Sequence, residues 1–293
     1  MSLACDLLRG AVDLHIHAAP DIVPRLLDDL ALARAARDAG MGAIVLKSHH
    51  MPTADRAQIA QTVVPELRIS GGLALNLPCC GGLNPEAVKV AIRMGAKIIW
   101  LPTLSAANHI EKTKTRVTGN LGVMSQGFTP RPVPVLGADG GVRPELVEIL
   151  TLIAEADILL ATGHLSAPEI GTVVDAAVRA GVRKILVNHP ELWLIGLNLE
   201  EQRELAAKGA LMEVCLRSAT APGHGEVSLK RLAERITAVG AEHVVMATDY
   251  GQVDSPAAPE GMRWYIAQML ECGVSAEDIE RMVKVNPRRL LGL

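Results

Sequence analysis

The feature that most constrains the fold of this chain is a regular alternation of short apolar runs with longer helix-like segments. Helical 3.6-residue periodicity recurs between the runs, at 26–39, 85–94, 143–156, 167–180, 199–208 and 229–239. The runs have the length and aliphatic composition of β-strands and lie at 12–17, 43–48, 69–76, 97–103, 158–164, 184–189, 210–216 and 243–249. Eight strands alternating with helices predict a parallel sheet, and eight is the number in a closed (β/α)8 TIM barrel.

A doubly wound open sheet is the alternative arrangement of the same elements. Such a sheet ordinarily carries a glycine-rich phosphate-binding turn after its first strand. The first apolar run here ends instead in His15-Ile16-His17, and glycines such as Gly40 and Gly95 close helical segments just before the next strand. The sequence therefore favours the α/β barrel over the open sheet.

The size and charge of the chain limit the classes of protein it can belong to. Its 293 residues suit one barrel-sized domain, which we expect to span 1–293. A net charge of −3 and 2% aromatic residues argue against nucleic-acid partners. No apolar run approaches the ~20 residues that cross a bilayer, and the N-terminus lacks a signal-peptide pattern. Five cysteines fit free thiols in a reducing compartment. We expect a cytoplasmic protein with a small-molecule substrate and no membrane partner; homo-oligomerisation stays open.

One segment interrupts the alternation. Residues 118–142 are rich in glycine and proline and lie between the fourth and fifth predicted strands. Within this excursion, 132–136 followed by Asp139-Gly140-Gly141 predicts a small hairpin with its turn at Asp-Gly. Long connections in compact domains are usually functional or disordered, so a lid over the barrel and a plain surface loop are both open interpretations.

Metal-ligating residue types end several of the predicted strands. His15 and His17 are two positions apart, so in a strand they face the same side and can share one ion. Sites of (β/α)8 barrels lie at the carboxyl ends of the strands, whereas His243 and Lys97 begin theirs. A single buried histidine is ordinarily a structural residue, but six candidates that all end strands favour a metal site: His15, His17, Lys47, His164, His189 and Asp249.

This ordered set resembles the amidohydrolase superfamily. The matching motifs run from the first strand to the last helix: His15-Ile16-His17, Thr162-Gly163-His164, Val187-Asn188-His189-Pro190, Ala247-Thr248-Asp249-Tyr250, and the closing helix of 286–293. The resemblance implies a (β/α)8 barrel that holds one or two divalent metal ions and catalyses hydrolysis.

The resemblance also implies a role for each residue. His15 and His17 would bind the more buried ion together with Asp249. His164 and His189 would bind a second ion; alternatively, His164 would join a mononuclear site while His189 orients the nucleophile. Asp249 would be the catalytic general base and then acid. Zinc suits these ligands, with manganese, iron or nickel as alternatives.

The chain departs from the superfamily pattern on the fourth strand. Binuclear members commonly carry a carboxylated lysine or a glutamate there, but this strand ends in Trp100-Leu101-Pro102-Thr103. We expect Lys47, at the end of the second strand, to replace it as a carboxylated bridging ligand, because an apolar run makes a charged lysine costly to bury. The alternative is a protonated lysine that pairs with Asp249 or polarises the substrate. In either case the chain would represent an uncharacterised branch of the superfamily, with the lysine on strand two.

Three further residues are candidates for substrate binding. His49 and His50 directly follow the second strand, although an ordinary loop position explains them equally simply. Arg217, after the seventh strand, could clamp a substrate carboxylate through two hydrogen bonds, or lie exposed at the start of a loop.

We therefore predict a metal-dependent hydrolase of a C–N bond, in an amide or cyclic amide, or of a lactone, in a small polar substrate. The alternatives are a non-oxidative decarboxylase, a phosphoesterase and a non-catalytic metal-binding barrel.

Overall fold

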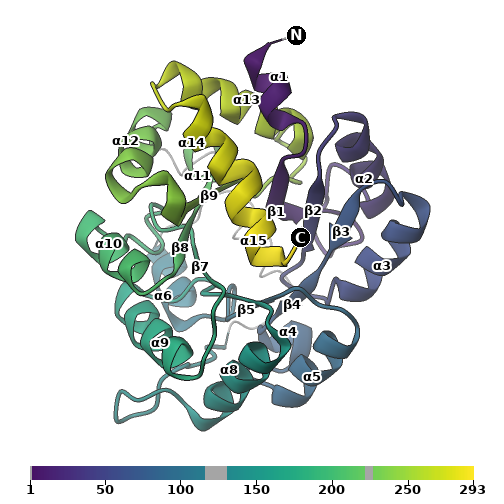
Figure 1. The fold of residues 1–293 in the computed structure, drawn as a ribbon. Helices are drawn as coiled ribbons and strands as arrows, with labels where there is room; N and C mark the ends of the chain where they lie inside the picture. The colour runs from purple at the N-terminus through teal and green to yellow at the C-terminus, as the bar shows by residue number, and fades with distance from the viewer. Residues whose placement is uncertain (1, 116–130, 222–226) are drawn as a thin grey trace.

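The predicted strands form the inner wall of a barrel in the computed structural model, which describes residues 2–115, 131–221 and 227–293. All hydrogen-bonded strand pairs are parallel, and helices surround them (Figure 1). The strands are β1 (Val12–His17), β2 (Ala43–Lys47), β3 (Arg68–Ser70), β4 (Gly72–Ala74), β5 (Ile98–Trp100), β6 (Leu159–Ala161), β7 (Ile185–Asn188), β8 (Leu211–Cys215) and β9 (Val244–Ala247). The predicted (β/α)8 class is confirmed, because β3 and β4 together occupy the third strand position.

The third strand is broken at Gly71, which divides the wall into sheets of order β1-β2-β3 and β4-β5-β6-β7-β8-β9. Thr53 fills the break: its hydroxyl donates to the carbonyl of Leu46 at 2.7 Å and accepts from the amide of Gly72 at 2.9 Å. A Cβ atom at Gly71 would collide with the carbonyl of Thr53, so only glycine lets the two backbones approach this closely. Thr53 thus links β2 to β4 across the break.

The barrel closes where the first strand meets the segment after the last. Ile16 and Tyr250 form a parallel bridge. The amide of Asp249 donates to the carbonyl of His15 at 2.9 Å, and the amide of His17 donates to the carbonyl of Tyr250 at 2.8 Å. We call these contacts the β1–β9 seam.

The helices follow the predicted alternation. They are α1 (Leu3–Leu8), α2 (Asp29–Asp38), α3 (Ala54–Val63), α4 (Leu77–Cys80), α5 (Pro85–Arg93), α6 (Ala107–Thr115), α8 (Pro144–Ala156), α9 (Ala167–Arg179), α10 (Leu199–Ala207), α11 (Arg217–Thr220), α12 (Leu229–Val239), α13 (Ala258–Glu271), α14 (Ala276–Glu280) and α15 (Asn286–Leu291). The six predicted helical segments correspond to α2, α5, α8, α9, α10 and α12. The periodicity did not predict α3, because its buried face consists of Ala54, Ala57 and Ala60 while Ile59 is exposed.

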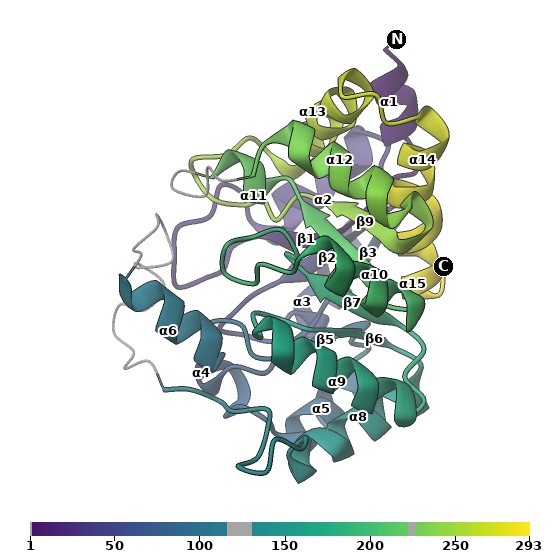
Figure 2. The same cartoon turned by 90° about the vertical axis from the view of Figure 1, so that its left-hand side faces the viewer.

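The two ends of the barrel differ. Figure 2 shows α15 at one end and α6 and α11 at the other. Leu290 and Leu291 of α15 pack into an interior apolar cluster with Val12, Leu14, Ala43, Val45, Ala74, Ile98, Trp100, Leu159, Ala161, Leu186, Leu211 and Val245. The amino ends of the strands are therefore sealed by apolar packing, and a site can open only at their carboxyl ends.

The glycine- and proline-rich excursion is described only in part. Its residues 118–130 lie outside the described ranges. In the rest, Leu136 and Val142 form an antiparallel bridge, and Gly137 donates to the carbonyl of Gly141 at 2.7 Å, which confirms the predicted turn. Among helices in the described ranges, none has the length and apolar character needed to cross a membrane.

Candidate metal centre

An irregularity in β1 directs both histidines of the His-x-His motif into the barrel. The paired residues are Val12–Ala43 and Asp13–Ile44, then Ile16–Leu46 and His17–Lys47, so β1 holds one residue more than β2 between them. Val12 and Leu14 pack inside the barrel, and so does His15, the next residue after Leu14. Side chains alternate in a regular strand, so the extra residue changes which face the histidines occupy.

His15, His17 and Asp249 form the centre of the site. The Nε2 atoms of His15 and His17 each lie 3.1 Å from Oδ1 of Asp249. Lys47 lies beside them, with its Nζ atom 2.8 Å from Nε2 of His15. The side chains of His15 and His17 are 0% and 2% exposed, whereas that of Asp249 is 19% exposed. Asp249 is therefore the member of this group that solvent reaches most readily.

The backbone at two of the candidate ligands is left-handed. Asp249 has φ = 55° and His189 has φ = 51°, values that non-glycine residues rarely adopt. Asp249 lies two residues after the end of β9, and His189 lies one residue after the end of β7. Such conformations persist where the surroundings hold them and cluster at functional sites, so they support a role for these two side chains beyond packing.

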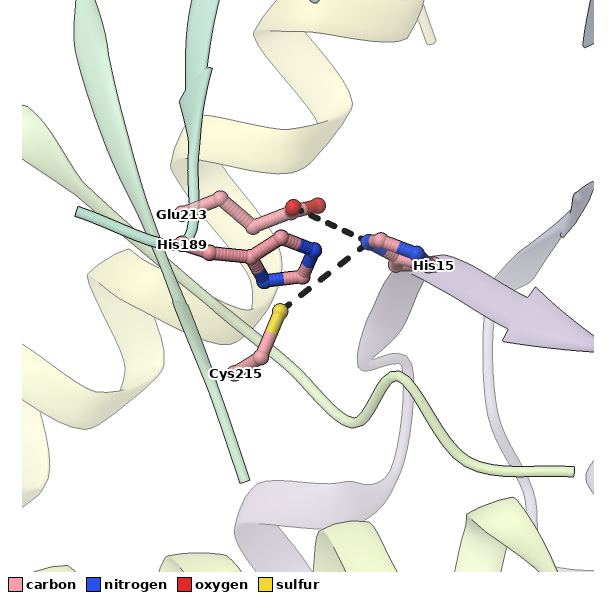
Figure 3. A group of neighbouring side chains, drawn as sticks. All are labelled: His15, His189, Glu213 and Cys215. Carbon is pink, nitrogen blue, oxygen red and sulfur yellow. Dashed lines mark hydrogen bonds and ion pairs between the residues drawn. The ribbon is translucent and has the colours of Figure 1, made fainter. Parts of the chain in front are cut away.

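Glu213 of β8 fixes the orientation of His15. Its Oε2 atom accepts a hydrogen bond from Nδ1 of His15 at 3.0 Å (Figure 3). The same atom accepts another from the side-chain amide of Asn188 at 2.6 Å. With its proton held at Nδ1, neutral His15 presents the lone pair of Nε2 to the site, as metal-bound histidines usually do. Sequence reasoning gave Glu213 no role; the available signal was a lone acidic residue within an apolar strand.

Asp13 is a second buried acid that sequence reasoning missed. Its carboxylate accepts from the hydroxyl of Thr248 at 2.6 Å and from the backbone amides of His15 and Thr248 at 3.1 and 3.2 Å. Burial raises the pKa of Asp13 to about 7 in spite of these hydrogen bonds. Asp13 thus ties the strand that carries His15 to the segment that carries Asp249.

His164 and His189 line the next part of the site. Their ring centroids lie 5.6 Å apart, and that of His189 lies 5.1 Å from His15. His109 of α6 stacks on His164 at 4.9 Å, with their Nδ1 atoms 2.8 Å apart. This contact leaves Nε2 of His164 for other partners. His109 was expected in a loop on the catalytic side and had no predicted role; it lies instead in α6.

Lys47 is fully enclosed. Its side chain is among the largest that are less than 2% exposed, and its ammonium nitrogen lies 5.5 Å from the ring centroid of Trp100. Burial lowers the pKa of Lys47, and Asp249 and Glu213 offset only part of this effect. The neutral amine, which is the form that reacts with carbon dioxide, is therefore favoured relative to an exposed lysine.

The loop after β1 supplies a further charged group beside the site. Arg25 donates through Nε and Nη2 to Oδ2 of Asp21, at 2.9 and 2.7 Å, and both side chains are shielded from solvent. Nη2 of Arg25 also lies 3.4 Å from Nδ1 of His17. Oδ1 of Asp21 lies 3.3 Å from Nδ1 of His50. His50, a predicted substrate contact, is thus connected to His17 through this loop.

His49 lies in the site itself rather than on an exposed loop. Its ring stacks on His17 at 5.0 Å and is 4% exposed. The hydroxyl of Thr103 accepts from the side-chain amide of Asn76 at 2.6 Å and is hydrogen-bonded to Nδ1 of His49 at 2.8 Å. These contacts hold the His49 ring in the site.

Arg217 lies at the start of α11 and is already paired. Its Nη1 and Nη2 atoms contact Oδ1 and Oδ2 of Asp254 at 3.0 and 3.1 Å. A carboxylate thus occupies the two-pronged face that was expected to hold the substrate. A substrate role for Arg217 remains a prediction, and it requires Asp254 to move away.

The residues present fit a divalent metal ion. Donor atoms of His15, His17 and Asp249 lie within 4.8 Å of one another, and two imidazoles with a carboxylate are a ligand set that zinc accepts. In the described part of the chain, Nδ1 of His189 and Oε1 of Glu213 are buried without a hydrogen-bond partner. An ion or a water beside such atoms is one way to satisfy them.

Solved structures with this fold include enzymes of the amidohydrolase class. An amidohydrolase from Pseudomonas aeruginosa has a TM-score of 0.59 at 14% identity, covering 99% of this chain and 97% of that one. A protein from Pseudomonas putida assigned as a 2-pyrone-4,6-dicarboxylic acid hydrolase has a TM-score of 0.61 at 17% identity, covering 97% of both chains. A 2,6-dihydroxybenzoate decarboxylase from Rhizobium has a TM-score of 0.52 at 15% identity, covering 97% and 99%. The resemblance to the amidohydrolase superfamily is confirmed at the level of the fold.

A family model assigns the chain more narrowly. It matches residues 10–213 and describes a family of unknown function, DUF6282. The chain belongs to this family. A search of curated protein sequences found no match to the chain.

Proposed function

We propose that this protein is a metal-dependent hydrolase that cleaves a C–N bond or a lactone in a small polar substrate. The observation that carries the proposal is the convergence of His15 and His17 on Oδ1 of Asp249, at 3.1 Å each, in a site closed to solvent except at Asp249. Zinc is the first candidate for the ion, with manganese, iron and nickel as alternatives. The ion, when bound, supplies Lewis acidity that polarises a carbonyl and makes water nucleophilic at neutral pH.

The residues of the chain supply the remaining functions. His15 and His17 would hold the ion, while Glu213 keeps the proton of His15 on Nδ1. Burial would raise the pKa of Asp249, but His15 and then His17 hold it well below its usual range, so the carboxylate is ionised and able to accept a proton. Asp249 passes this proton to the leaving group, which completes general base and then acid catalysis.

The central experiment replaces Asp249 by asparagine. Asp249→Asn keeps the shape and removes the proton acceptor, so turnover of a panel of lactones and cyclic amides should fall by about 10²–10⁴-fold. Bound metal, measured by elemental analysis, should be retained. Asp175→Asn, which alters a carboxylate on α9 that pairs with Lys208, is the matched control and should retain full activity. Equal activity of Asp249→Asn and the wild type, or full activity after chelation, would contradict the proposal.

Lys47 is proposed to be carboxylated. The neutral amine attacks carbon dioxide, a C–N bond forms, and the amine loses a proton, which leaves an anionic carbamate able to bind metal. Its burial and the absence of an acidic residue at the end of β5 in the described sequence support this. Protein equilibrated with ¹³C-labelled bicarbonate should show a carbamate carbon resonance that Lys47→Ala lacks.

Non-oxidative decarboxylation is the second candidate. It is favoured by one observation: the Nζ atom of Lys47 lies 2.8 Å from His15, where an uncarboxylated ammonium would attract a substrate carboxylate. Release of carbon dioxide from aromatic acids, in a protein without a carbamate resonance, would favour this reaction over hydrolysis.

A further inference from the structure

A second group of metal-ligating side chains lies on the opposite side of His15 from Asp249. Glu213 and Cys215 are two positions apart on β8 and face the same side of the strand, and His189 follows β7. Figure 3 shows the imidazole of His189 between the carboxylate of Glu213 and the thiol of Cys215, with His15 opposite them. One donor atom from each of these four residues lies within 4.8 Å of the others.

This group is buried and incompletely satisfied. Glu213 is 0%, Cys215 1% and His189 4% exposed. Oε2 of Glu213 is used by His15 and Asn188, but its Oε1 atom and Nδ1 of His189 have no partner among the described residues. A buried carboxylate with an orphaned oxygen is costly unless a cation or a water lies beside it.

We propose that Glu213, His189 and Cys215 form a second, inner site that binds a thiophilic divalent cation such as Zn²⁺, Co²⁺ or Cd²⁺. A donor set of one thiolate, one imidazole and one carboxylate suits these ions and disfavours Mg²⁺ and Ca²⁺. When the metal–sulfur bond forms, the thiol proton of Cys215 goes to solvent, and nothing is oxidised or reduced. His15 stays hydrogen-bonded to Glu213, with its Nδ1 atom 3.9 Å from Sγ of Cys215.

The inner site is distinct from the group formed by His15, His17 and Asp249, and it has a consequence for that group. A neutral imidazole has a single lone pair, so His189 serves the inner ion through Nδ1 or a second ion on the Asp249 side through Nε2, but not both. Occupation of the inner site therefore leaves His15, His17 and Asp249 free to hold one ion.

Cobalt spectroscopy tests the proposal without an activity assay. Metal-free full-length protein is titrated with Co²⁺, and the absorbance is followed from the near ultraviolet to the visible. A thiolate ligand gives an intense sulfur-to-cobalt charge-transfer band in the near ultraviolet, so the wild type should show this band and Cys215→Ser should lose it. The double variant Cys79→Ser/Cys80→Ser, which removes the adjacent thiols of α4, is the matched control and should keep it.

Two further variants separate the two sites, and X-ray absorption tests the sulfur ligand directly. His17→Ala should keep the charge-transfer band, because His17 belongs only to the group that it forms with His15 and Asp249. Glu213→Gln should weaken cobalt binding at the inner site at least about tenfold. X-ray absorption of cobalt-loaded wild type should show a sulfur neighbour at about 2.3 Å, which makes the test independent of how Cys215→Ser folds. Absence of the band and of the sulfur neighbour in the wild type, or a band that persists in Cys215→Ser, would overturn the proposal.

Discussion

The two histidines of the His-x-His motif have opposite electrostatic surroundings. On the β8 side, His15 donates to the carboxylate of Glu213 at 3.0 Å. On the side of the loop after β1, His17 faces the guanidinium of Arg25 at 3.4 Å. Burial and Lys47 lower the pKa of His15, but Glu213 and Asp249 raise it further, to about 9. Burial and Arg25 lower the pKa of His17 to about 3.

This difference shows that adjacent positions on one strand can have separate functions. The carboxylate makes His15 the stronger base and fixes its tautomer, so the β8 side governs how tightly an ion is held. The cation beside His17 keeps that imidazole neutral, and its buried pair with Asp21 holds the loop in place. We therefore expect substitutions on the β8 side to change metal affinity and substitutions on the Arg25 side to change stability.

The largest expected effect is on the Arg25 side. Arg25→Met leaves the shielded carboxylate of Asp21 with His50 as its remaining partner, at 3.3 Å, which should lower the free energy of unfolding by up to about 3–5 kcal/mol. Metal affinity should change less than about tenfold, since Arg25 contacts His17 at Nδ1, at 3.4 Å, and not at the Nε2 atom that faces Asp249. Calorimetric unfolding of the metal-free protein measures the first effect. Asp21→Asn combined with Arg25→Met removes both charges and should recover most of the loss; no recovery would contradict a role for the pair.

The next effect is on the β8 side. Glu213→Gln keeps the hydrogen bond from His15 but removes the charge, so zinc affinity should fall about 10–100-fold, as for other groups that orient metal-bound histidines. Competition with a chromophoric chelator measures it. Asp29→Asn, in a buried carboxylate that pairs with Arg56 at 2.7 Å, is the matched control and should leave the affinity unchanged. If Asp29→Asn lowered zinc affinity more than Glu213→Gln does, the β8 side would have no special role in holding the ion.

The third expected effect is a pH dependence. His15 must lose a proton to bind metal through Nε2, and its pKa is about 9, so affinity should rise about tenfold per pH unit between pH 7 and 9 and then level off. His17, with a pKa of about 3, should contribute no slope in this range. Calorimetry in buffers of different ionisation enthalpy counts the protons released. In Glu213→Gln the levelling point should shift to lower pH; an unchanged profile would mean that Glu213 does not set the basicity of His15.

The sequence predicted the barrel and the positions of the candidate ligands because both follow from short-range patterns. Strand ends that carry His15, His17, Lys47, His164 and His189 can be read from apolar runs, and parallel strands place them at one face. Glu213 was not predicted, because a role in orienting another side chain depends on a contact between β1 and β8. Asp13 was missed for the same reason, since its partner is Thr248 at the other end of the chain.

Two other features lay beyond sequence reasoning for different reasons. The extra residue in β1 that turns His15 inward depends on the register with β2, which a single strand does not specify. The Arg25–Asp21 pair lies in an irregular loop, where no periodicity indicates which side chains are buried.

The β1–β9 seam joins residues from the two ends of the chain, and this has a consequence for how the protein folds. Contacts so distant in sequence close a long loop and cost much chain entropy, so they are poorly suited to form early. His15 and Asp249 meet only when this closure is complete, and an ion bound between them would stabilise the closed barrel alone. A bound ion would thus also stabilise the β1–β9 seam against local opening.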